Sequence, residues 1–181
     1  MMAMKVLLHL CCGVCGPYPV RTLRAEGHDV QGFWYNPNIH PLVEYRKRLD
    51  GVEKFASKSD LLLLTEDDYD LEGFLRAVAF RETERCRPCY AMRLEKAANF
   101  AKKGKYDAFT TTLLMSPHQK HELVQEVGQA AGKRYGVEFI YVDMRPGWRE
   151  NDSAAREMAI YRQQYCGCIY SEEERYRNCQ A

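Results

Sequence analysis

Short apolar runs alternate with longer amphipathic stretches along this chain. The apolar runs cover residues 6–10, 30–35, 61–64, 108–113 and 139–142. Runs of this length, placed between turn residues, are typical of strands that are buried in a sheet. Because the stretches between them are long enough for helices, the pattern predicts an α/β fold with right-handed crossovers. We therefore expect a mainly parallel five-stranded sheet with helices on both faces.

The stretches between the apolar runs carry the periodicity of helices. From Tyr45 to Ala56 the apolar positions recur four, three and four residues apart, as one helical face requires. Pro41 stands where it can open this helix, and Asp70 can cap the next one. The other predicted helices cover residues 17–27, 71–78, 86–104, 123–131 and 153–164. In a fold of this kind, functional sites form beyond the carboxyl ends of the strands.

Length and composition fit one globular domain that spans residues 1–181. Of the 181 residues, 46% are hydrophobic and 28% are charged, and no long linker or repeat interrupts them. A net charge of +1 gives no overall sign of nucleic-acid binding. The apolar run near the amino terminus is too short for a signal peptide, and no run is long enough to span a bilayer. We expect a cytoplasmic protein without a membrane partner.

Eight cysteines are many for a cytoplasmic chain, and seven of them fall into three groups. We name these the first group (Cys11-Cys12-x-x-Cys15), the second group (Cys86-x-x-Cys89) and the third group (Cys166-x-Cys168). In a reducing compartment such clusters are more often metal ligands or catalytic thiols than structural disulfides. Thiols three residues apart can face one centre from a single helical turn, and a helix amino terminus favours the thiolate that binds metal. The first group follows the first strand, so we expect it at the carboxyl edge of the sheet.

The spacing alone leaves several interpretations of the thiols open. Two cysteine pairs suffice for a structural zinc site, but seven thiols exceed what one closed zinc site uses. A [4Fe–4S] cluster takes the same ligand type, which places iron–sulfur modestly ahead of zinc. Cys166 and Cys168 could instead form a strained, readily reduced disulfide that suits a thiol–disulfide oxidoreductase. Cys179, alone near a polar tail, is interpreted as an ordinary free thiol.

Longer motifs around the three groups point to one family. They read LHLCCGVC at residues 8–15, CRPCY at 86–90, TTLLMSPHQ at 111–119, DMRP at 143–146 and YRQQYCGC at 161–168. Together they resemble the cobalamin-independent epoxyqueuosine reductases of the QueH type, in order from about residue 6 to residue 171. That family reduces the epoxide of epoxyqueuosine, at the wobble position of tRNA, to queuosine. The resemblance implies an oxidoreductase that acts on tRNA and takes electrons from a donor that the sequence does not identify.

The resemblance also implies a cofactor and its ligands. Family members carry a [4Fe–4S] cluster, and the matching positions of this chain are Cys11, Cys12, Cys86 and Cys89. A second, mononuclear iron beside the cluster has been described for the family. Cys166 and Cys168 would then be either ligands of that metal or a redox-active, catalytic pair. Cys15 would join the metal ligands, although some relatives have aspartate at this position.

The fold that the resemblance implies is similar to PP-loop and HUP-like nucleotide-binding domains. Those proteins place a glycine- and serine-rich phosphate loop after the first strand, whereas Cys11-Cys12-Gly13-Val14-Cys15 stands there in this chain. Metal ligands therefore take the place of the phosphate cradle, and we predict no use of ATP. His9, inside the preceding strand, is interpreted as a hydrogen-bonded core residue.

Five further residues are candidates for the reaction or for substrate contact. Asp143 follows the fifth strand and is a candidate proton donor, although an aspartate there is as often a helix cap or a salt-bridge partner. The others combine charge with an aromatic face, as stacking on an extruded base requires. They are Arg145, Trp148, Arg149 and Arg162, for which a solvated surface is an equal interpretation. The alternative function is a zinc-stabilised nucleic-acid-binding module without redox activity.

Overall fold

The computed structural model describes residues 3–177, and its strands form one parallel sheet. The sheet has five strands in the order β3-β2-β1-β4-β5, and every neighbouring pair is parallel. The strands are β1 (Lys5–His9), β2 (Asp29–Trp34), β3 (Leu63–Thr65), β4 (Ala108–Thr111) and β5 (Glu138–Phe139). The strand order reverses at β1, which places a crevice beyond the carboxyl ends of β1 and β4. The predicted sheet is confirmed.

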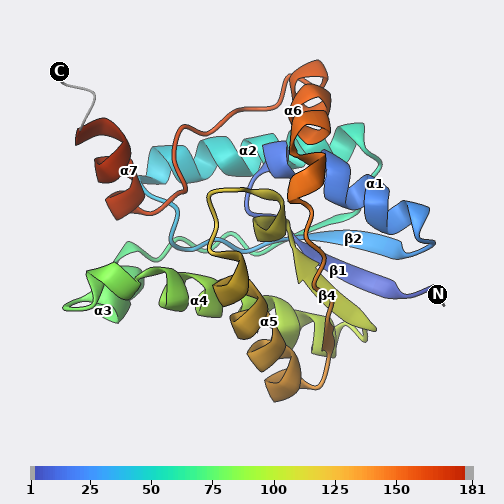
Figure 1. Cartoon of the computed structure of the whole chain (residues 1–181), viewed down its shortest axis with the longest axis horizontal. Coiled ribbons are helices and arrows are strands. Elements are labelled where there is room, and N and C mark those ends of the chain that lie inside the picture. The colour runs from blue at the N-terminus through green and yellow to red at the C-terminus, as the bar shows by residue number, and fades with distance from the viewer. Residues whose placement is uncertain (1–2, 178–181) are drawn as a thin grey trace.

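Helices cover both faces of the sheet (Figure 1), as the sequence predicts. One face carries α1 (Pro17–Ala25), α2 (Leu42–Lys58) and α6 (Trp148–Glu157). The opposite face carries α3 (Leu71–Val78), α4 (Cys86–Lys103) and α5 (His121–Tyr135). The last helix, α7 (Ile169–Tyr176), lies beside the start of α2 at the left of the view. Short 3-10 turns are η1 (Gly13–Cys15), η2 (Glu82–Glu84), η3 (Thr112–Met115) and η4 (Arg145–Gly147).

Local chemistry explains where several of these elements begin and end. The Asp70 carboxylate accepts a hydrogen bond of 2.8 Å from the Gly73 backbone N–H, so it caps α3 as predicted. Gly136 ends α5 in the left-handed conformation, with a φ of 68°, which glycine adopts without strain. The strand predicted at residues 108–113 stops at Thr111, because the Thr111 hydroxyl accepts from the Leu113 N–H and turns the chain into η3.

The core forms where the helices pack on the central strands. Leu7 and Leu8 of β1 and Phe109 of β4 have no exposed surface, because helices cover both sides of these strands. Each apolar side chain of this size contributes roughly 1.5–3 kcal/mol when it is fully buried. The end of β1 is therefore a rigid base for the residues that follow it.

The carboxyl-terminal part of the chain differs from the prediction. The helix predicted at residues 153–164 begins earlier, at Trp148, and ends at Glu157. Ala159 adopts a φ of 49°, and the N–H groups of Ala159 and Ile160 bond back to α6, which closes the helix. Residues 158–168 form a loop that leads into α7, a helix that the sequence analysis did not identify. We name residues 158–168 the crossing loop.

Two further expectations concern membrane-spanning helices and Cys179. Within residues 3–177, no helix is both long enough and apolar enough to cross a membrane. Cys179, interpreted above as an ordinary thiol, lies outside the described residues.

Candidate metal centre

The first group of cysteines forms a compact set of thiols just beyond β1. The sulfur atoms of Cys11, Cys12 and Cys15 all lie within 4.8 Å of one another, and those of Cys11 and Cys12 are 3.7 Å apart. All three residues are buried. Among residues 3–177, this is the one set of three or more cysteine, histidine or acidic side chains close enough to share a metal ion. The turn η1 thus brings neighbouring thiols to one site.

Contacts with two helices fix the position of η1. A Cβ atom on Gly13 would lie 2.2 Å from the Gly51 carbonyl oxygen, so only glycine allows η1 to approach α2 this closely. Asn151 of α6 is buried and bonds to the other side of the turn. Its Nδ2 donates to the Val14 carbonyl at 2.7 Å, and its Oδ1 accepts from the Tyr18 N–H at 3.0 Å. The sequence analysis did not identify Asn151.

Hydrogen bonds within the first group favour one thiolate. The thiols of Cys12 and Cys15 and the Thr112 hydroxyl donate to the sulfur of Cys11, which lowers its pKa well below the usual value. Burial raises the pKa of Cys12, and the bond that Cys15 donates to Cys11 raises that of Cys15. The hydrogen bonds therefore favour the thiolate at Cys11 over those at Cys12 and Cys15, and binding of a metal by the latter two would release their protons.

The second group opens α4, as predicted. Cys86 is the first helical residue, and Cys89 lies one turn later in the buried interior. Burial raises the pKa of Cys89 to about 11. Tyr90, the next residue, donates from its hydroxyl to Gln119 Oε1 at 2.7 Å. The Nε2 of the same Gln119 donates to the sulfur of Cys166 at 3.2 Å, so one glutamine connects α4 to the third group.

The crossing loop carries the third group over the carboxyl edge of the sheet. Gln163 of this loop donates from Nε2 to the sulfur of Cys12 at 3.0 Å. Arg48 of α2 donates to the carbonyl groups of Cys166, at 2.8 Å, and of Tyr165, at 2.9 Å. Gly167 has a φ of 144°, a region that favours glycine, and it lets the loop pass close to Arg48. Each thiol of the third group is free.

Arg93 of α4 interacts with thiols from all three groups. The side chain is buried, with 2% of its surface exposed, and its Nε donates to Asn38 Oδ1 at 2.8 Å. Burial opposes its charge, yet electrostatic attraction to cysteines of the three groups raises the pKa of Arg93. These cysteines are Cys89, Cys11, Cys166 and Cys168. The three groups, far apart in the sequence, therefore converge on one guanidinium.

Sequence reasoning missed Arg93, although its spacing carries a signal. The residue lies four positions after Cys89 and seven after Cys86, which places it on the same face of α4. A buried arginine on the face that presents thiols is a candidate counter-charge for an anionic centre.

The residues around the thiols fit an iron–sulfur or zinc centre. Sulfur is the ligand that both prefer in proteins. The buried His40 Nε2, near Arg93, has no hydrogen-bond acceptor among residues 3–177, and the buried Asn38 Nδ2 has only the sulfur of Cys89 as a partner there. Buried donors without acceptors are costly, and an anionic metal–thiolate centre would offer them acceptors. The cation on Arg93 suits the same negative charge.

Asp143, the predicted proton donor, forms a salt bridge. Its two carboxylate oxygens accept from Arg145 Nε at 2.8 Å and from Nη2 at 2.6 Å. The bonds from Arg145 lower the pKa of Asp143 to about 2, so the carboxyl group is ionised at neutral pH. An ionised carboxylate has no proton to donate, so Asp143 is better interpreted as a salt-bridge partner than as a proton donor.

The other candidate substrate residues lie at or near the start of α6 and on the crossing loop. Trp148 is half-buried against the core, and Arg149 is exposed without an ion-pair partner in residues 3–177. Arg162 is exposed and bonds to Asp152 of α6. His9 is fully buried between Thr111 and the Tyr35 carbonyl, which confirms that it is a hydrogen-bonded core residue.

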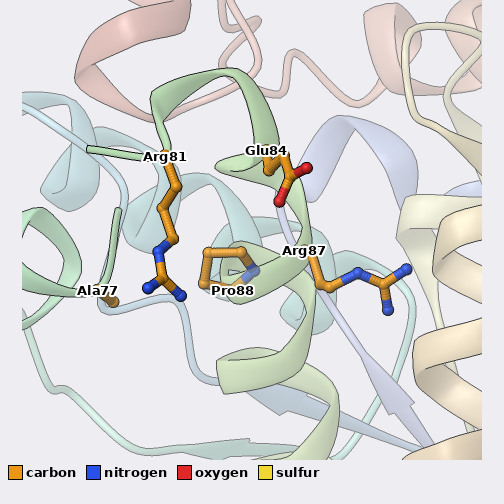
Figure 2. Close-up of a pocket in the computed structure, with 5 residues that line it drawn as sticks. All are labelled: Ala77, Arg81, Glu84, Arg87 and Pro88. Carbon is orange, nitrogen blue, oxygen red and sulfur yellow. The ribbon is translucent and has the colours of Figure 1, made fainter. Parts of the chain in front are cut away.

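A small pocket lies on the outer side of the first turn of α4 (Figure 2). Its volume is about 220 Å³, and it is lined by Ala77, Arg81, Glu84, Arg87 and Pro88. Arg81 and Arg87 extend to opposite sides of Pro88 in this view. Arg87 forms two bonds of 2.8 Å with the Glu126 carboxylate, so its charge is neutralised there. The pocket holds none of the thiols.

Fold and site together define a class of protein: an α/β domain with a parallel five-stranded sheet that carries a compact set of thiols just beyond its first strand. The fold is similar to the crystal structure of a predicted subunit of tRNA methyltransferase from Methanocaldococcus jannaschii. The TM-score is 0.53 at 16% identity, and the match covers 85% of this chain and 75% of that chain. At this identity the similarity concerns the fold alone.

Sequence comparison places the chain within a family. The family model of epoxyqueuosine reductase QueH matches residues 6–174. A QueH of Dehalococcoides mccartyi is 39% identical over 97% of this chain and 96% of its own length. A QueH of Thermotoga maritima is 34% identical over 94% of this chain and 91% of its own length. This chain belongs to the epoxyqueuosine reductase QueH family.

Proposed function

We propose that this protein reduces the epoxide of epoxyqueuosine at the wobble position of tRNA, giving queuosine. The observation that carries the proposal is the convergence of the three thiol groups at the carboxyl edge of the sheet. Gln163 of the crossing loop bonds to Cys12, and Gln119 joins Cys166 to α4. Membership of the QueH family supports the choice of reaction and of tRNA as the substrate. In this proposal the whole chain, residues 1–181, acts as one cytoplasmic metal-binding domain.

The thiols divide between two roles in this proposal. A [4Fe–4S] cluster would be held by Cys11, Cys12, Cys86 and Cys89. The compactness of the first group supports the first two of these, and the position of the second group in the first turn of α4 supports the others. Cys15 lies within 4.8 Å of two of the proposed ligands and would bind a second, mononuclear iron. Cys166 and Cys168 would bind the same iron or act as a redox pair.

Electron and proton balance favours a role for the third group. Removal of an epoxide oxygen as water consumes two electrons and two protons. Oxidation of the Cys166 and Cys168 thiols to a disulfide releases two electrons and two protons, which matches this demand. An external donor would then reduce the disulfide. A bound iron–sulfur centre would supply electron transfer, and an open iron would supply Lewis acidity.

The protein residues around the third group would prepare it for this reaction. Cys166 is exposed, so a nucleotide of the tRNA can approach it from solvent. Gln119 holds its sulfur through a bond of 3.2 Å, and Arg48 holds its carbonyl oxygen. Cys168 is buried beside it, with its sulfur 3.6 Å from the Ser171 hydroxyl. Cys166 would thus be the thiol nearer to solvent, although burial of its sulfur raises its pKa, and Cys168 would be the thiol screened from water.

Substrate contact is proposed for the start of α6 and the crossing loop. An arginine and a tryptophan that flank a site can stack on an extruded base and contact its phosphates. The proposed contacts are Arg145, Trp148, Arg149 and Arg162. Among these, Arg149 has an exposed and unpaired guanidinium within the described part of the chain, which supports a phosphate contact.

Anaerobic purification followed by iron, zinc and sulfide analysis tests the cofactor. The proposal expects iron and sulfide in the purified protein, with reduction of epoxyqueuosine in tRNA when a chemical reductant is added. Cys166→Ser and Cys168→Ser should each abolish turnover, whereas Cys179→Ser serves as the matched control and should keep it. Full activity of both third-group variants would contradict the redox role.

A zinc-stabilised nucleic-acid-binding module is the second candidate. The three thiols of the first group would also suit zinc, because a tetrahedral zinc site accepts thiolates at such spacing. This alternative expects a colourless protein that contains zinc, resists oxygen and does not reduce the epoxide. The same metal analysis separates the two functions.

A further inference from the structure

Two arginines are almost completely buried, and their surroundings differ. Arg48 and Arg93 each have 2% of their surface exposed. Arg48 forms an ion pair with Glu44 at 2.7 Å and donates to two backbone carbonyl groups. Arg93 has no carboxylate within ion-pair distance among residues 3–177, and Asn38 is its one hydrogen-bond partner there. A carboxylate neutralises the charge of Arg48, whereas the charge of Arg93 is balanced only by the thiols that face it.

A buried cation without an anion is expensive for a fold to maintain. Removing such a charge from water costs roughly several kcal/mol unless an opposite charge compensates it. Arg93 projects from the same face of α4 as Cys86 and Cys89. The anion that balances it must therefore come from the thiol site.

We propose that Arg93 is the fixed counter-charge of the metal–thiolate centre, which it holds in place and whose reduction potential it raises. The inference rests on the proposed function, because it takes the thiols to hold a metal. Arg93 acts through the centre without touching substrate, so it is a positioning residue. Asn38 fixes the direction of the guanidinium through the bond of 2.8 Å to its Nε.

The sign of the effect follows from electrostatics. Reduction adds one negative charge to the centre, and a nearby fixed cation stabilises the reduced form more than the oxidised form. In a buried site with little water, this difference is larger than it would be at the surface. Loss of the charge on Arg93 should therefore lower the midpoint potential and weaken retention of the metal.

Substitutions that remove or keep the positive charge of Arg93 test the inference. Arg93→Gln removes the charge and keeps an amide that can reach Asn38, and Arg93→Lys keeps the charge. Arg87→Gln is the matched control, because Arg87 lies on the same helix but is exposed and paired with Glu126. Midpoint potentials come from a redox titration followed by electron paramagnetic resonance on anaerobically purified protein. Metal retention comes from the rate of iron loss to a chelator.

The expected result is a lower midpoint potential in Arg93→Gln, with potentials close to the parent in Arg93→Lys and Arg87→Gln. Iron loss to the chelator should be about 10- to 100-fold faster in Arg93→Gln, because loss of a residue that supports metal ligands weakens metal binding by about this factor. If Arg93→Gln yields no folded protein, Arg93→Met preserves the buried volume and takes its place.

Stability of the metal-free protein gives a second readout. Without the metal, the thiolate favoured at Cys11 is the charge left to balance Arg93. Relative to its own parent, metal-free Arg93→Gln should therefore lose less resistance to urea than the metal-loaded variant does. Equal midpoint potentials in the parent and Arg93→Gln, at equal iron content, would overturn the inference. Absence of iron from the parent protein would overturn the proposed function instead, so the two failures are distinguishable.

Discussion

The amide nitrogen of Gln163 lies 3.0 Å from the sulfur of Cys12, although 151 positions separate the two residues. A second amide, that of Gln119, lies 3.2 Å from the sulfur of Cys166. Each glutamine donates to a thiol of a different group. The crossing loop and the loop before α5 are thereby tied to the cysteines, so the geometry of the centre depends on contacts between remote segments.

The bond from Gln163 should be needed for metal binding at the first group. Gln163→Ala removes a donor that stabilises the thiolate of Cys12, so iron affinity should fall about tenfold or more. Gln164→Ala is the control, because this neighbour is exposed and bonds within its own loop, to the Arg162 carbonyl. Iron content after anaerobic gel filtration measures both. Equal iron content in the two variants would contradict a role for Gln163.

A methyl group should have opposite effects at two glycines that face each other. In Gly13→Ala the new Cβ meets the Gly51 carbonyl oxygen at 2.2 Å, so η1 must move away from α2. We expect a loss of about 1–3 kcal/mol in the free energy of unfolding, together with loss of bound metal.

Gly51→Ala provides the matched comparison. Its Cβ would find nothing closer than the Tyr161 Cβ at 3.6 Å, which is ordinary contact. Because alanine favours helix over glycine, this substitution within α2 should raise stability by about 0.5–1 kcal/mol. Urea unfolding measures both changes, and a neutral Gly13→Ala would show that η1 does not depend on this close approach.

The fold follows from local patterns, but the centre does not. Apolar runs and helical spacing predict each strand of the sheet and all helices up to residue 135, because these signals depend on neighbours in the sequence. The last part of the chain is polar. The sequence predicts the start of α6 at residue 153 rather than at Trp148, because no side chain caps the helix there. The crossing loop has no periodicity, so its path could not be predicted.

The site was predictable only where the residue type itself carries the chemistry. Clustered cysteines are rare enough to stand out, whereas Asn151, Gln119 and Gln163 act through long-range bonds that no spacing shows. Arg93 was predictable in part. Its distance from the second group along α4 was visible in the sequence, but its burial and its lack of a carboxylate partner were not.

His40 should make the protein sensitive to mild acid. The residue is buried against Tyr69 and Phe74, and its Nδ1 accepts from the Ile169 N–H at 3.3 Å. Burial, with a smaller effect of the Arg93 charge, lowers the pKa of His40 from 6.5 to about 4. Between about pH 4 and pH 6.5, His40 is therefore protonated in the unfolded chain and neutral in the folded chain. Stability is complete above about pH 6.5 and falls as the pH drops toward 4, by about 2–3 kcal/mol.

Urea unfolding of metal-free protein at several pH values tests this expectation. His40→Gln keeps an oxygen that can accept from Ile169 and cannot titrate, so its stability should change less between pH 7 and pH 5. The dependence should be reduced rather than abolished, because burial also lowers the pKa of His9 to about 4. An unchanged pH dependence in His40→Gln would show that the histidine does not titrate in this way.

Arg149 should contribute a phosphate contact to tRNA binding. It is exposed at the start of α6 and has no ion-pair partner among residues 3–177, so its full charge is available to RNA. Arg149→Ala should weaken tRNA binding uniformly and lower the slope of log affinity against log salt by about 1. Arg156→Ala is the control, because Arg156 lies on the same helix but pairs with Asp152 at 3.0 Å. Binding measured by fluorescence anisotropy across a salt series decides the matter, since an unchanged slope in Arg149→Ala would mean that this end of α6 does not meet the RNA backbone.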